Sequence, residues 1–421
     1  MLRFWGCPGS RTSRPPRQKP EPVRNYDAIV IGAGPAGSTA ACLLARQGRS
    51  VALFDRDAFP RFHVGESLIP AVNLTLGRLG VLDKVDALRS PRKHGVQFYS
   101  QKGPSRPFYF SECEDARLHQ TWQVLRSDFD AMLVDEARSL GVDVATGTEV
   151  LDVVADGDAV AGAVVRGPGG QEMETVGSRA VIDASGLHGV VTKRFGEREL
   201  LDDLKNVAVF SHFEGVRVDE GIDAGSTIVF KIDAASWIWF IPLPDAVSIG
   251  VVTAADRVQK FGSVPEEILS NAIAASPHLA ERMVDARRTR DVAVVRDFSY
   301  LARREGGPGW LLAGDALGFL DPVYSSGLFL SMLSAEHAAD AVHTALDGAD
   351  APDFTGYAKD YRVAFQRFLP LVRAFYADGF RFGPLAEEPR KRRGLVDMLI
   401  GSVGTPEAIE VSEAIAAMLS A

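Results

Sequence analysis

Cysteine is scarce in this chain: three occur among 421 residues, Cys7, Cys42 and Cys113. Their number is odd and no two have C-x-x-C spacing, which excludes a disulfide framework and is typical of a reducing compartment. We therefore expect a cytoplasmic protein. The eight histidines show neither H-x-H nor H-E-x-x-H spacing, so no metal site is expected.

Long apolar runs and excess positive charge are also lacking. No stretch of about 18 apolar residues occurs, so no membrane span is expected. The formal net charge of -9 argues against a nucleic-acid partner. With 46% hydrophobic residues the chain can bury a large core. Residues 1–25 are rich in arginine and proline without an apolar segment, so we expect a disordered extension and not a secretory signal.

A β-α-β unit with a glycine-rich turn follows this extension. The apolar run 26–31 leads directly into GAGPAG at 32–37, and a second apolar run ends at Asp55. In such a unit the first glycine permits the tight turn, the second lets the backbone approach a pyrophosphate, and the third lets the helix pack on the sheet. The expected dinucleotide contacts are Gly32, Gly34, Ala36, Gly37 and Asp55. The motif leaves NAD and FAD open, and no second G-x-G-x-x-G is present to form a nicotinamide domain.

Strand-like runs dominate the middle of the chain, and helical periodicity dominates its end. The strand-like runs are 208–216, 227–232, 237–241 and 247–253. They predict a second, largely antiparallel sheet. Residues 353–382 and 405–419 have apolar residues at helical spacing. We expect a dinucleotide fold that is interrupted by a β-rich insertion and closed by C-terminal helices.

Two of the five tryptophans lie two residues apart in the apolar stretch SWIWFIP at 236–242. On a strand, Trp237, Trp239 and Ile241 share one face, and the residues between them point the other way. Core packing explains such a stripe without any function. The neighbouring motifs favour a functional interpretation.

Several motifs together resemble the superfamily of FAD-dependent monooxygenases, halogenases and geranylgeranyl reductases. They are GAGPAG at 32–37, FPRFHVGESLIP at 59–70, RSDFD at 126–130, DASG at 183–186 and Gly314-Asp315. The stretch WIWFIP matches the WxWxIP signature of the flavin-dependent halogenase branch, of the phenol and pyrrole type. The resemblance extends over residues 26–385.

The resemblance implies an α/β fold with FAD as the dinucleotide. The implied fold is an FAD-binding Rossmann-like domain (GR2-type, three-layer ββα/βαβ) with an inserted antiparallel β-sheet substrate domain and C-terminal helices. The implied FAD contacts add Arg126, Asp183, Gly314 and Asp315 to the glycine-rich unit. Arg126 has two other interpretations, as a cap of the helix that begins near Ser127 or as the partner of an acid on that helix.

The expected domain boundaries follow from this fold. The FAD-binding domain is discontinuous and comprises 26–92, 111–204 and 290–345. The β-rich substrate domain comprises 93–110 and 205–289, and the C-terminal helical region comprises 346–421.

The resemblance also implies a reaction and its residues. Reduced FAD, supplied by a separate flavin reductase, reacts with O2 and with chloride or bromide to give hypohalous acid. The implied halide site is Ser326 and Gly327, before the helix that begins near Leu328; a serine cap without a ligand is the alternative. The implied catalytic residues are Glu66, Lys93, Trp237 and Trp239. The tryptophans separate substrate from flavin, and Lys93 either donates a hydrogen bond to the hypohalous acid or is itself halogenated.

One position narrows the expected substrate. Tryptophan halogenases carry a glutamate where this chain has Tyr324, so free tryptophan is not expected. We expect a small phenolic or pyrrolic ring, free or tethered to a carrier protein, in secondary metabolism such as antibiotic biosynthesis. The basic segment 390–393 either docks an acidic carrier or is a solvated turn. The alternative functions are an aromatic hydroxylase, a geranylgeranyl-reductase-like oxidoreductase and an inactive flavin-binding module.

Overall fold

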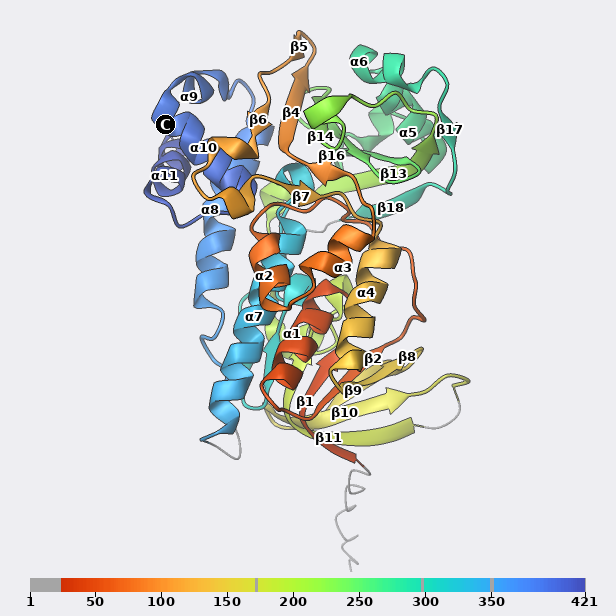
Figure 1. The fold of residues 1–421 in the computed structure, drawn as a ribbon, viewed down its shortest axis with the longest axis vertical. Helices are drawn as coiled ribbons and strands as arrows, with labels where there is room; N and C mark the ends of the chain where they lie inside the picture. The colour runs from red at the N-terminus through yellow and green to blue at the C-terminus, as the bar shows by residue number, and fades with distance from the viewer. Residues whose placement is uncertain (1–23, 171–172, 297–298, 349–351, 421) are drawn as a thin grey trace, which may run out of the picture.

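The computed structural model describes residues 24–170, 173–296, 299–348 and 352–420. The expected disordered extension therefore lies outside the described residues, apart from Arg24 and Asn25. Figure 1 shows two sheets arranged one above the other along the long axis of the molecule, with the glycine-rich unit in the lower part. The C-terminal helices lie beside the upper part.

The lower sheet carries the glycine-rich motif. Its parallel strands run in the order β21-β11-β1-β2-β8, and β20, β10 and β9 extend it with antiparallel pairings. The strands are β1 (Arg24–Ile31), β2 (Val51–Asp55), β8 (Asp143–Thr146), β9 (Glu149–Asp156), β10 (Ala159–Arg166), β11 (Met173–Asp183), β20 (Gly306–Gly307) and β21 (Trp310–Leu312). β2 is buried along its whole length, as expected for a parallel strand that is covered on both faces.

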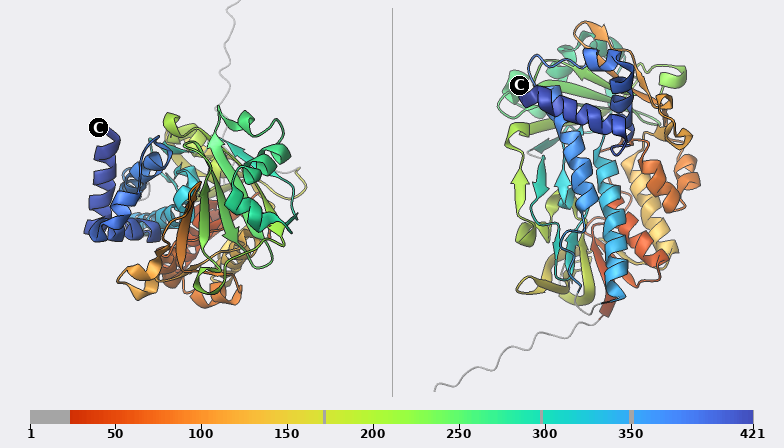
Figure 2. Two further views of the ribbon diagram at one scale, coloured as in Figure 1. Left: turned by 90° about the horizontal axis from the view of Figure 1, so that it is seen from above. Right: turned by 90° about the vertical axis from the view of Figure 1, so that its left-hand side faces the viewer.

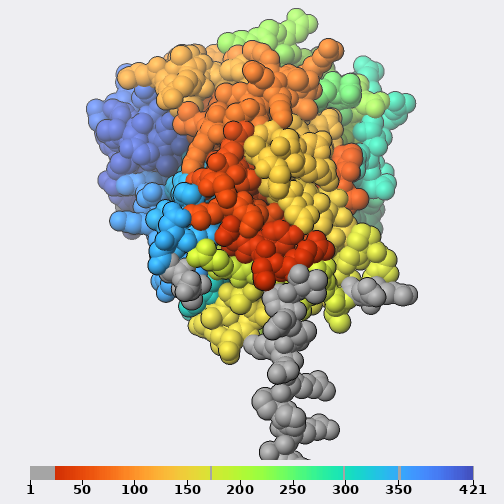
Figure 3. Space-filling model, turned by 60° about the horizontal axis from the view of Figure 1, so that its bottom comes forward, coloured from red at the N-terminus to blue at the C-terminus, as the bar shows by residue number. Residues whose placement is uncertain are grey.

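Three long helices pack along this sheet: α1 (Pro35–Arg46), α4 (Arg126–Ser139) and α7 (Gly327–Leu346). α1 connects β1 to β2 and packs against both α4 and α7. Pro35 suits the first turn of α1 because its fixed φ matches the helix. In the space-filling view the first β-α-β unit (red) lies beside the residues of α4 (yellow) on one face (Figure 3). The expected β-α-β unit is therefore confirmed.

The upper sheet has nine strands in the order β17-β13-β16-β15-β14-β4-β5, with β18 on β13 and β6 on β4. They are β4 (Gly95–Ser100), β5 (Gly103–Pro104), β6 (Phe108–Tyr109), β13 (Asn206–Glu214), β14 (Thr227–Lys231), β15 (Ser236–Pro242), β16 (Val247–Ala254), β17 (Arg287–Arg288) and β18 (Ala293–Arg296). The sheet is antiparallel except where β14 pairs with β4. β18 continues it past residue 289, where we expected the insertion to end.

The tryptophan strand β15 alternates as its sequence predicts. Trp237, Trp239 and Ile241 belong to the main core, which they share with β1, whereas Ile238 and Phe240 belong to a second core on the far side of the sheet. Helices α5 (Pro265–Ala274) and α6 (Pro277–Ala280) cover that second core.

Trp239 needs the glycine that faces it. Gly250 is its partner on β16, and a Cβ at Gly250 would lie 2.3 Å from Trp239 Cζ2. The absence of a side chain at Gly250 therefore leaves the space that the indole occupies.

The C-terminal region is helical, as expected. It comprises α8 (Lys359–Tyr376), α9 (Gly383–Glu387), α10 (Pro389–Ile400) and α11 (Pro406–Ser420). α11 packs on α8 and α10, and Figure 2 shows these helices as one layer beside the upper sheet. Within the described residues, every helix is too short or too polar to cross a membrane.

Short elements complete the fold. They are α2 (Val72–Arg78), α3 (Leu82–Ala87), β3 (Arg92–Lys93), β7 (Thr121–Trp122), β12 (Arg198–Leu200), β19 (Tyr300–Ala302) and β22 (Gly318–Phe319). β3 pairs with β7, which places Lys93 opposite Thr121 just ahead of β4.

Candidate active site

A cavity of about 440 Å³ lies between the two sheets. From the lower part it is lined by the expected cofactor residues Gly32, Gly34, Ala36, Asp55, Arg126 and Asp315. Trp237 and Trp239 line it from the upper sheet, and Glu66 and Gly327 line it from segments between the two sheets. The structure thus brings most of the residues expected from the sequence to one cavity, although they come from distant parts of the chain.

Three of the expected cofactor residues shape the cavity from behind its lining. A Cβ at Gly37 would lie 1.8 Å from the Gly32 carbonyl oxygen, so only glycine fits there. Gly314 has a φ of +62° and lies close to Ala36. The Asp183 carboxylate accepts hydrogen bonds from the backbone N–H groups of Ser185, Val191 and Thr192. Asp183 therefore holds the turn after β11 and has no free lone pair directed at the cavity lining.

The surroundings of the glycine-rich turn fit a dinucleotide. Arg61 lines the cavity, and a Cβ at Gly34 would lie 3.5 Å from Arg61 Nη2. Arg61 Nε is buried and donates no hydrogen bond. The guanidinium forms ion pairs with Asp130 (Nη1, 3.4 Å) and Asp57 (Nε, 3.8 Å), which hold it beside the N-terminus of α1. A cation in this position suits a pyrophosphate. Asp55 Oδ2 accepts from the Ala33 N–H at 2.7 Å, which places its carboxylate beside the same turn.

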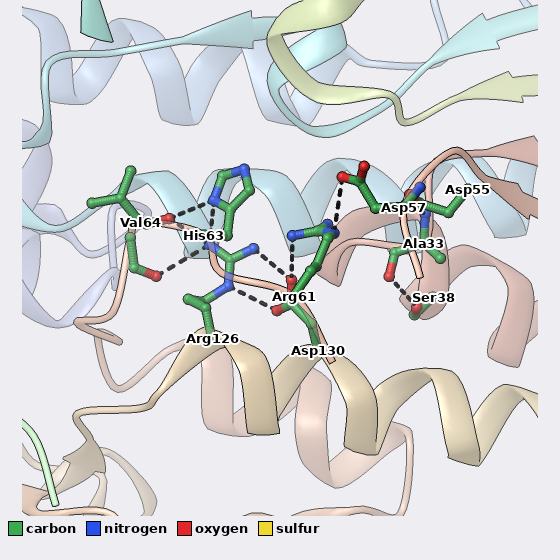
Figure 4. Close-up of polar contacts among 10 residues, drawn as sticks. Ala33, Ser38, Asp55, Asp57, Arg61, His63, Val64, Arg126 and Asp130 are labelled. Atoms are coloured by element: carbon green, nitrogen blue, oxygen red, sulfur yellow. Dashed lines mark hydrogen bonds and ion pairs between the residues drawn. The ribbon is translucent and has the colours of Figure 1, made fainter. Parts of the chain in front are cut away.

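Arg126 connects α4 to the segment that follows Arg61, as Figure 4 shows. Its Nε and Nη2 donate to the two carboxylate oxygens of Asp130 at 2.7 and 3.0 Å, and its Nη1 donates to the Val64 carbonyl at 2.7 Å. The interpretation of Arg126 as the partner of an acid on its own helix is therefore confirmed.

Asp315 lies at the end of β21 and lines the cavity. Burial raises the pKa of its carboxyl to about 6, and the Ser331 hydroxyl, which donates to Oδ1 at 3.1 Å, opposes that shift. A carboxyl in this position can accept hydrogen bonds from the hydroxyls of a ribityl chain.

The two tryptophans form one wall of the cavity, which we call the tryptophan wall (Trp237 and Trp239). Their ring centroids are 6.2 Å apart. Trp237 Nε1 donates to the Tyr376 hydroxyl at 2.6 Å, and Trp239 Nε1 donates to Ser248 Oγ at 3.1 Å. Both indoles are thus held in one orientation by hydrogen bonds as well as by packing.

The turn before α7 presents an unusual serine. Ser326 precedes the first residue of the helix, Gly327, but its side chain makes no capping hydrogen bond. Its Oγ is fully buried and has no hydrogen-bond partner. The serine-cap alternative is therefore wrong. Ser325 and Gly327 line the cavity on either side of Ser326.

Tyr324, the residue expected to narrow the substrate, faces the C-terminal helices. Its hydroxyl donates to the Leu371 carbonyl of α8 at 3.2 Å, and its ring packs against Phe98 and Phe375. The neighbouring Asp321 accepts from Asn206 Nδ2 and from the Tyr376 hydroxyl, each at 2.8 Å. α8 is therefore bonded to both the turn and the tryptophan wall.

Lys93 is fully buried behind the cavity lining. Its Nζ donates to Ser67 Oγ at 2.8 Å and to the Leu68 carbonyl at 3.0 Å, and it lies 5.6 Å from the Phe110 ring centroid. Burial lowers the pKa of its amine to about 7. Ser67 itself lines the cavity. Sequence reasoning selected Lys93 and did not select Ser67, although Ser67 follows Glu66 directly.

Glu66 lines the cavity and is bonded to a histidine from the upper sheet. Its Oε1 lies 2.7 Å from His212 Nε2, and its Oε2 is buried without a hydrogen-bond partner. His212 is one of the few polar side chains in the buried strand β13. A titratable side chain at a buried position of this strand is the sequence signal that could have identified it.

The basic segment 390–393 forms the first turn of α10 and is paired within the chain. Its ion pairs join Arg390 to Glu410, Lys391 to Glu388, Arg392 to Glu112 and Arg393 to Asp397. The Arg392 guanidinium also lies over the Phe108 ring. These pairs leave little positive charge for an acidic partner, and the segment is a helix and not the solvated turn of the alternative.

Comparison with known proteins agrees with this geometry. The model of the FAD binding domain family matches residues 25–365. A "1H-pyrrole-2-carbonyl-[peptidyl-carrier protein] brominase" of Pseudoalteromonas luteoviolacea is 33% identical over 90% of this chain and 92% of its own length. A "Tryptophan 2-halogenase" of Chondromyces crocatus is 33% identical over 83% of this chain and 67% of its own length.

A solved structure is similar over nearly the whole chain. It is that of the flavin-dependent brominase Bmp2, with a TM-score of 0.84 and 30% identity, covering 94% of this chain and 98% of that one. The cavity, the dinucleotide turn and these similarities lead to one conclusion: this chain belongs to the FAD binding domain family and is a flavin-dependent halogenase.

Proposed function

We propose that this enzyme halogenates an electron-rich pyrrole or phenol ring, presented on a carrier protein or free, with chloride or bromide. The observation that carries the proposal is the single cavity that runs from the glycine-rich turn to the tryptophan wall. When bound and reduced, FAD supplies the oxidation of halide by O2 to hypohalous acid. The steps that follow are those of this chain's own residues.

Cofactor binding is assigned to the turn and its charged neighbours. Gly32, Gly34 and the N-terminus of α1 face the pyrophosphate, with Arg61 as its cation. Asp55 accepts from the ribose, and Asp315 accepts from the ribityl chain. The position of the Arg61 guanidinium beside Gly34 supports this assignment.

Halide binding is assigned to Ser326 and Gly327. The first N–H groups of a 20-residue helix attract an anion. The buried Ser326 hydroxyl has a hydrogen to donate and no acceptor among the residues that the structure describes. Burial of a hydroxyl without a partner is costly, and a halide ion would relieve that cost.

The tryptophan wall and Lys93 are assigned to the substrate side. The wall keeps the ring to be halogenated away from the reactive part of the cofactor, so that hypohalous acid and not the cofactor reaches the substrate. Lys93 acts on the oxygen of that acid. Glu66, held by His212, accepts hydrogen bonds within the cavity through its free Oε2.

The ring class rests on the pyrrolyl brominase among the relatives and on Tyr324 in the turn. A tryptophan 2-halogenase has the same sequence identity to this chain over a shorter span, so indole is the second candidate ring.

We infer a separate flavin reductase because a second glycine-rich nucleotide motif does not occur in the sequence. The two described cysteines are free thiols, which supports a cytoplasmic location.

The test is a reconstituted reaction. Purified protein is mixed with FAD, a flavin reductase, NADH and O2, with chloride or bromide. The substrates are carrier-bound pyrrole-2-carboxylate, free phenols and free tryptophan. A halogen isotope pattern in the pyrrole or phenol products by mass spectrometry is the expected result. Hydroxylated products that do not depend on halide would contradict the proposal and favour an aromatic hydroxylase.

A further inference from the structure

Ser67 separates Lys93 from the cavity. The Lys93 side chain is fully buried, and its Nζ donates to the Oγ of Ser67, a residue that lines the cavity, at 2.8 Å. Its other hydrogen bond goes to the Leu68 carbonyl. A proton moves between hydrogen-bonded atoms. A proton that Lys93 gives to a molecule in the cavity therefore passes through Ser67.

Ser67 belongs to a chain of hydrogen bonds that begins at Gln123. Gln123 Nε2 donates to the Gly225 carbonyl and to Thr227 Oγ1, each at 2.9 Å, which uses both of its hydrogens. Thr227 Oγ1 and Ser67 Oγ lie 2.9 Å apart, and either hydroxyl can donate to the other. When Thr227 is the donor, Ser67 accepts from both Lys93 and Thr227, and its own hydroxyl hydrogen is left for the cavity.

We propose that Ser67 is a catalytic residue that passes a proton from Lys93 to the oxygen of hypohalous acid, and that Thr227 and Gln123 position its hydroxyl. The proposal rests on the proposed function, because it assumes that hypohalous acid is the halogen donor. It assigns Lys93 an indirect action in place of the direct contact with the acid that the resemblance implies.

The step balances as follows. The Ser67 hydroxyl hydrogen moves to the oxygen of the hypohalous acid while a hydrogen of the Lys93 ammonium replaces it on Oγ. The oxygen–halogen bond breaks, the ring carbon takes the halogen, and water leaves. The ring is then cationic and loses its C–H proton to Ser67, which returns one to the neutral Lys93 amine. No oxidant beyond hypohalous acid is consumed.

The surroundings of Lys93 suit an amine that both gives and takes a proton. The groups that face its Nζ are the Ser67 hydroxyl, the Leu68 carbonyl and the Phe110 ring. Burial alone lowers the pKa of this amine to about 7, and no charged side chain of the described residues contributes to the shift. A pKa near the operating pH is the most effective for proton transfer in both directions.

The first test is Ser67→Ala. A 1,3-diketone trap measures the hypohalous acid released, and mass spectrometry measures the halogenated product. We expect the ratio of product to hypohalous acid to fall about 100-fold, the usual effect of removing a general acid. In protein without flavin, ¹³C NMR of labelled lysine should show a lower pKa for Lys93, since the ammonium loses an acceptor. An unchanged ratio of product to hypohalous acid would overturn the proposal, whatever the pKa of Lys93.

Thr227 offers a matched pair for the positioning role. Valine has the shape of threonine without its hydroxyl, and serine keeps the hydroxyl. Thr227→Val should lower the ratio of product to hypohalous acid and change the dependence of this ratio on pH. Thr227→Ser should restore most of the ratio and most of its pH dependence. Equal behaviour of the two variants would refute the positioning role, and this comparison decides the matter if Ser67→Ala does not fold.

The proton transfer from Lys93 through Ser67, here called the relay, and the proposed function fail in experimentally different ways. If the unaltered enzyme releases no hypohalous acid and halogenates no ring, the proposed function is wrong and the relay with it. If the unaltered enzyme halogenates and Ser67→Ala matches its ratio of product to hypohalous acid, the relay alone is wrong.

Discussion

Trp237 and Tyr376 are joined by a hydrogen bond of 2.6 Å, from the indole Nε1 to the phenol oxygen. The same phenol donates to Asp321 at 2.8 Å, on the turn that leads to Ser326. One hydroxyl of α8 therefore holds both the tryptophan wall and the turn assigned to the halide. Neither contact could be inferred from the spacing of these residues in the chain.

Tyr376→Phe should disturb both sides of the cavity. The change leaves a buried indole N–H without a partner, at a cost of about 1–3 kcal/mol in the free energy of unfolding. We also expect more hydrogen peroxide to be released for each molecule of halogenated product, which we call uncoupling. Tyr361→Phe is the control, because Tyr361 lies on the same helix and its hydroxyl donates to the Gly318 carbonyl of β22 and not to a tryptophan or to Asp321. Equal uncoupling in both variants would contradict the prediction.

Arg61→Ala should weaken FAD binding. Loss of a charge-assisted hydrogen bond costs about 1.5–3 kcal/mol, which raises the Kd about 10- to 100-fold. Quenching of flavin fluorescence on titration measures the Kd. Arg49→Ala is the matched control, since Arg49 donates to the His343 carbonyl at 2.8 Å and does not line the cavity. A similar Kd in both variants would show that Arg61 does not contact the cofactor.

Ser326→Ala separates halide binding from helix capping. A capping serine contributes about 1 kcal/mol, but Ser326 makes no capping bond. Because the change removes a buried hydroxyl without a partner, we expect the unfolding free energy without halide to rise by about 1–3 kcal/mol. The KM for chloride or bromide should rise while the KM for the organic substrate stays constant. In contrast, Ser412→Ala removes a hydrogen bond to the Arg367 carbonyl and should lower stability without changing the KM for halide.

Lys93 should make stability depend on pH above neutrality. Its pKa is about 7 in the folded protein and 10.5 in the unfolded chain. Between these values the unfolded chain binds the additional proton, so the free energy of unfolding rises with pH over this window. Below pH 7 both states are protonated and the slope from this group vanishes. Urea titrations of Lys93→Met should lack this component of the slope; a slope equal to that of the unaltered protein would refute it.

The sequence alone predicted those parts of the site that are formed by residues close together in the chain. The spacing of glycines at 32–37 predicted the turn, and Gly37 is required there because a Cβ would strike the Gly32 carbonyl. Strand periodicity predicted that Trp237 and Trp239 share a face, and both line the cavity. In each case the geometry arises from residues a few positions apart.

Contacts between distant elements could not be predicted in this way. Glu66 and His212 are 146 residues apart, and Trp237 and Tyr376 are 139 apart. The register of β13 and the position of α8 create these pairs, and neither follows from local spacing. Lys93 is a further example. The sequence predicted that Lys93 takes part in the reaction, but only the fold shows that Ser67 lies between Lys93 and the cavity.

The pairing of Trp239 with Gly250 has a consequence for redesign. The indole occupies space that exists only because its partner on β16 has no side chain. Reshaping the cavity for a bulkier ring by shrinking Trp239 alone would open a void inside the sheet, and enlarging Gly250 alone would expel the indole. A Cβ at Gly250 would also lie 2.5 Å from the Cβ of Phe210 on β13. Position 250 therefore has to stay glycine, and directed evolution of substrate range should replace Trp239 together with a residue that packs on it, such as Phe210.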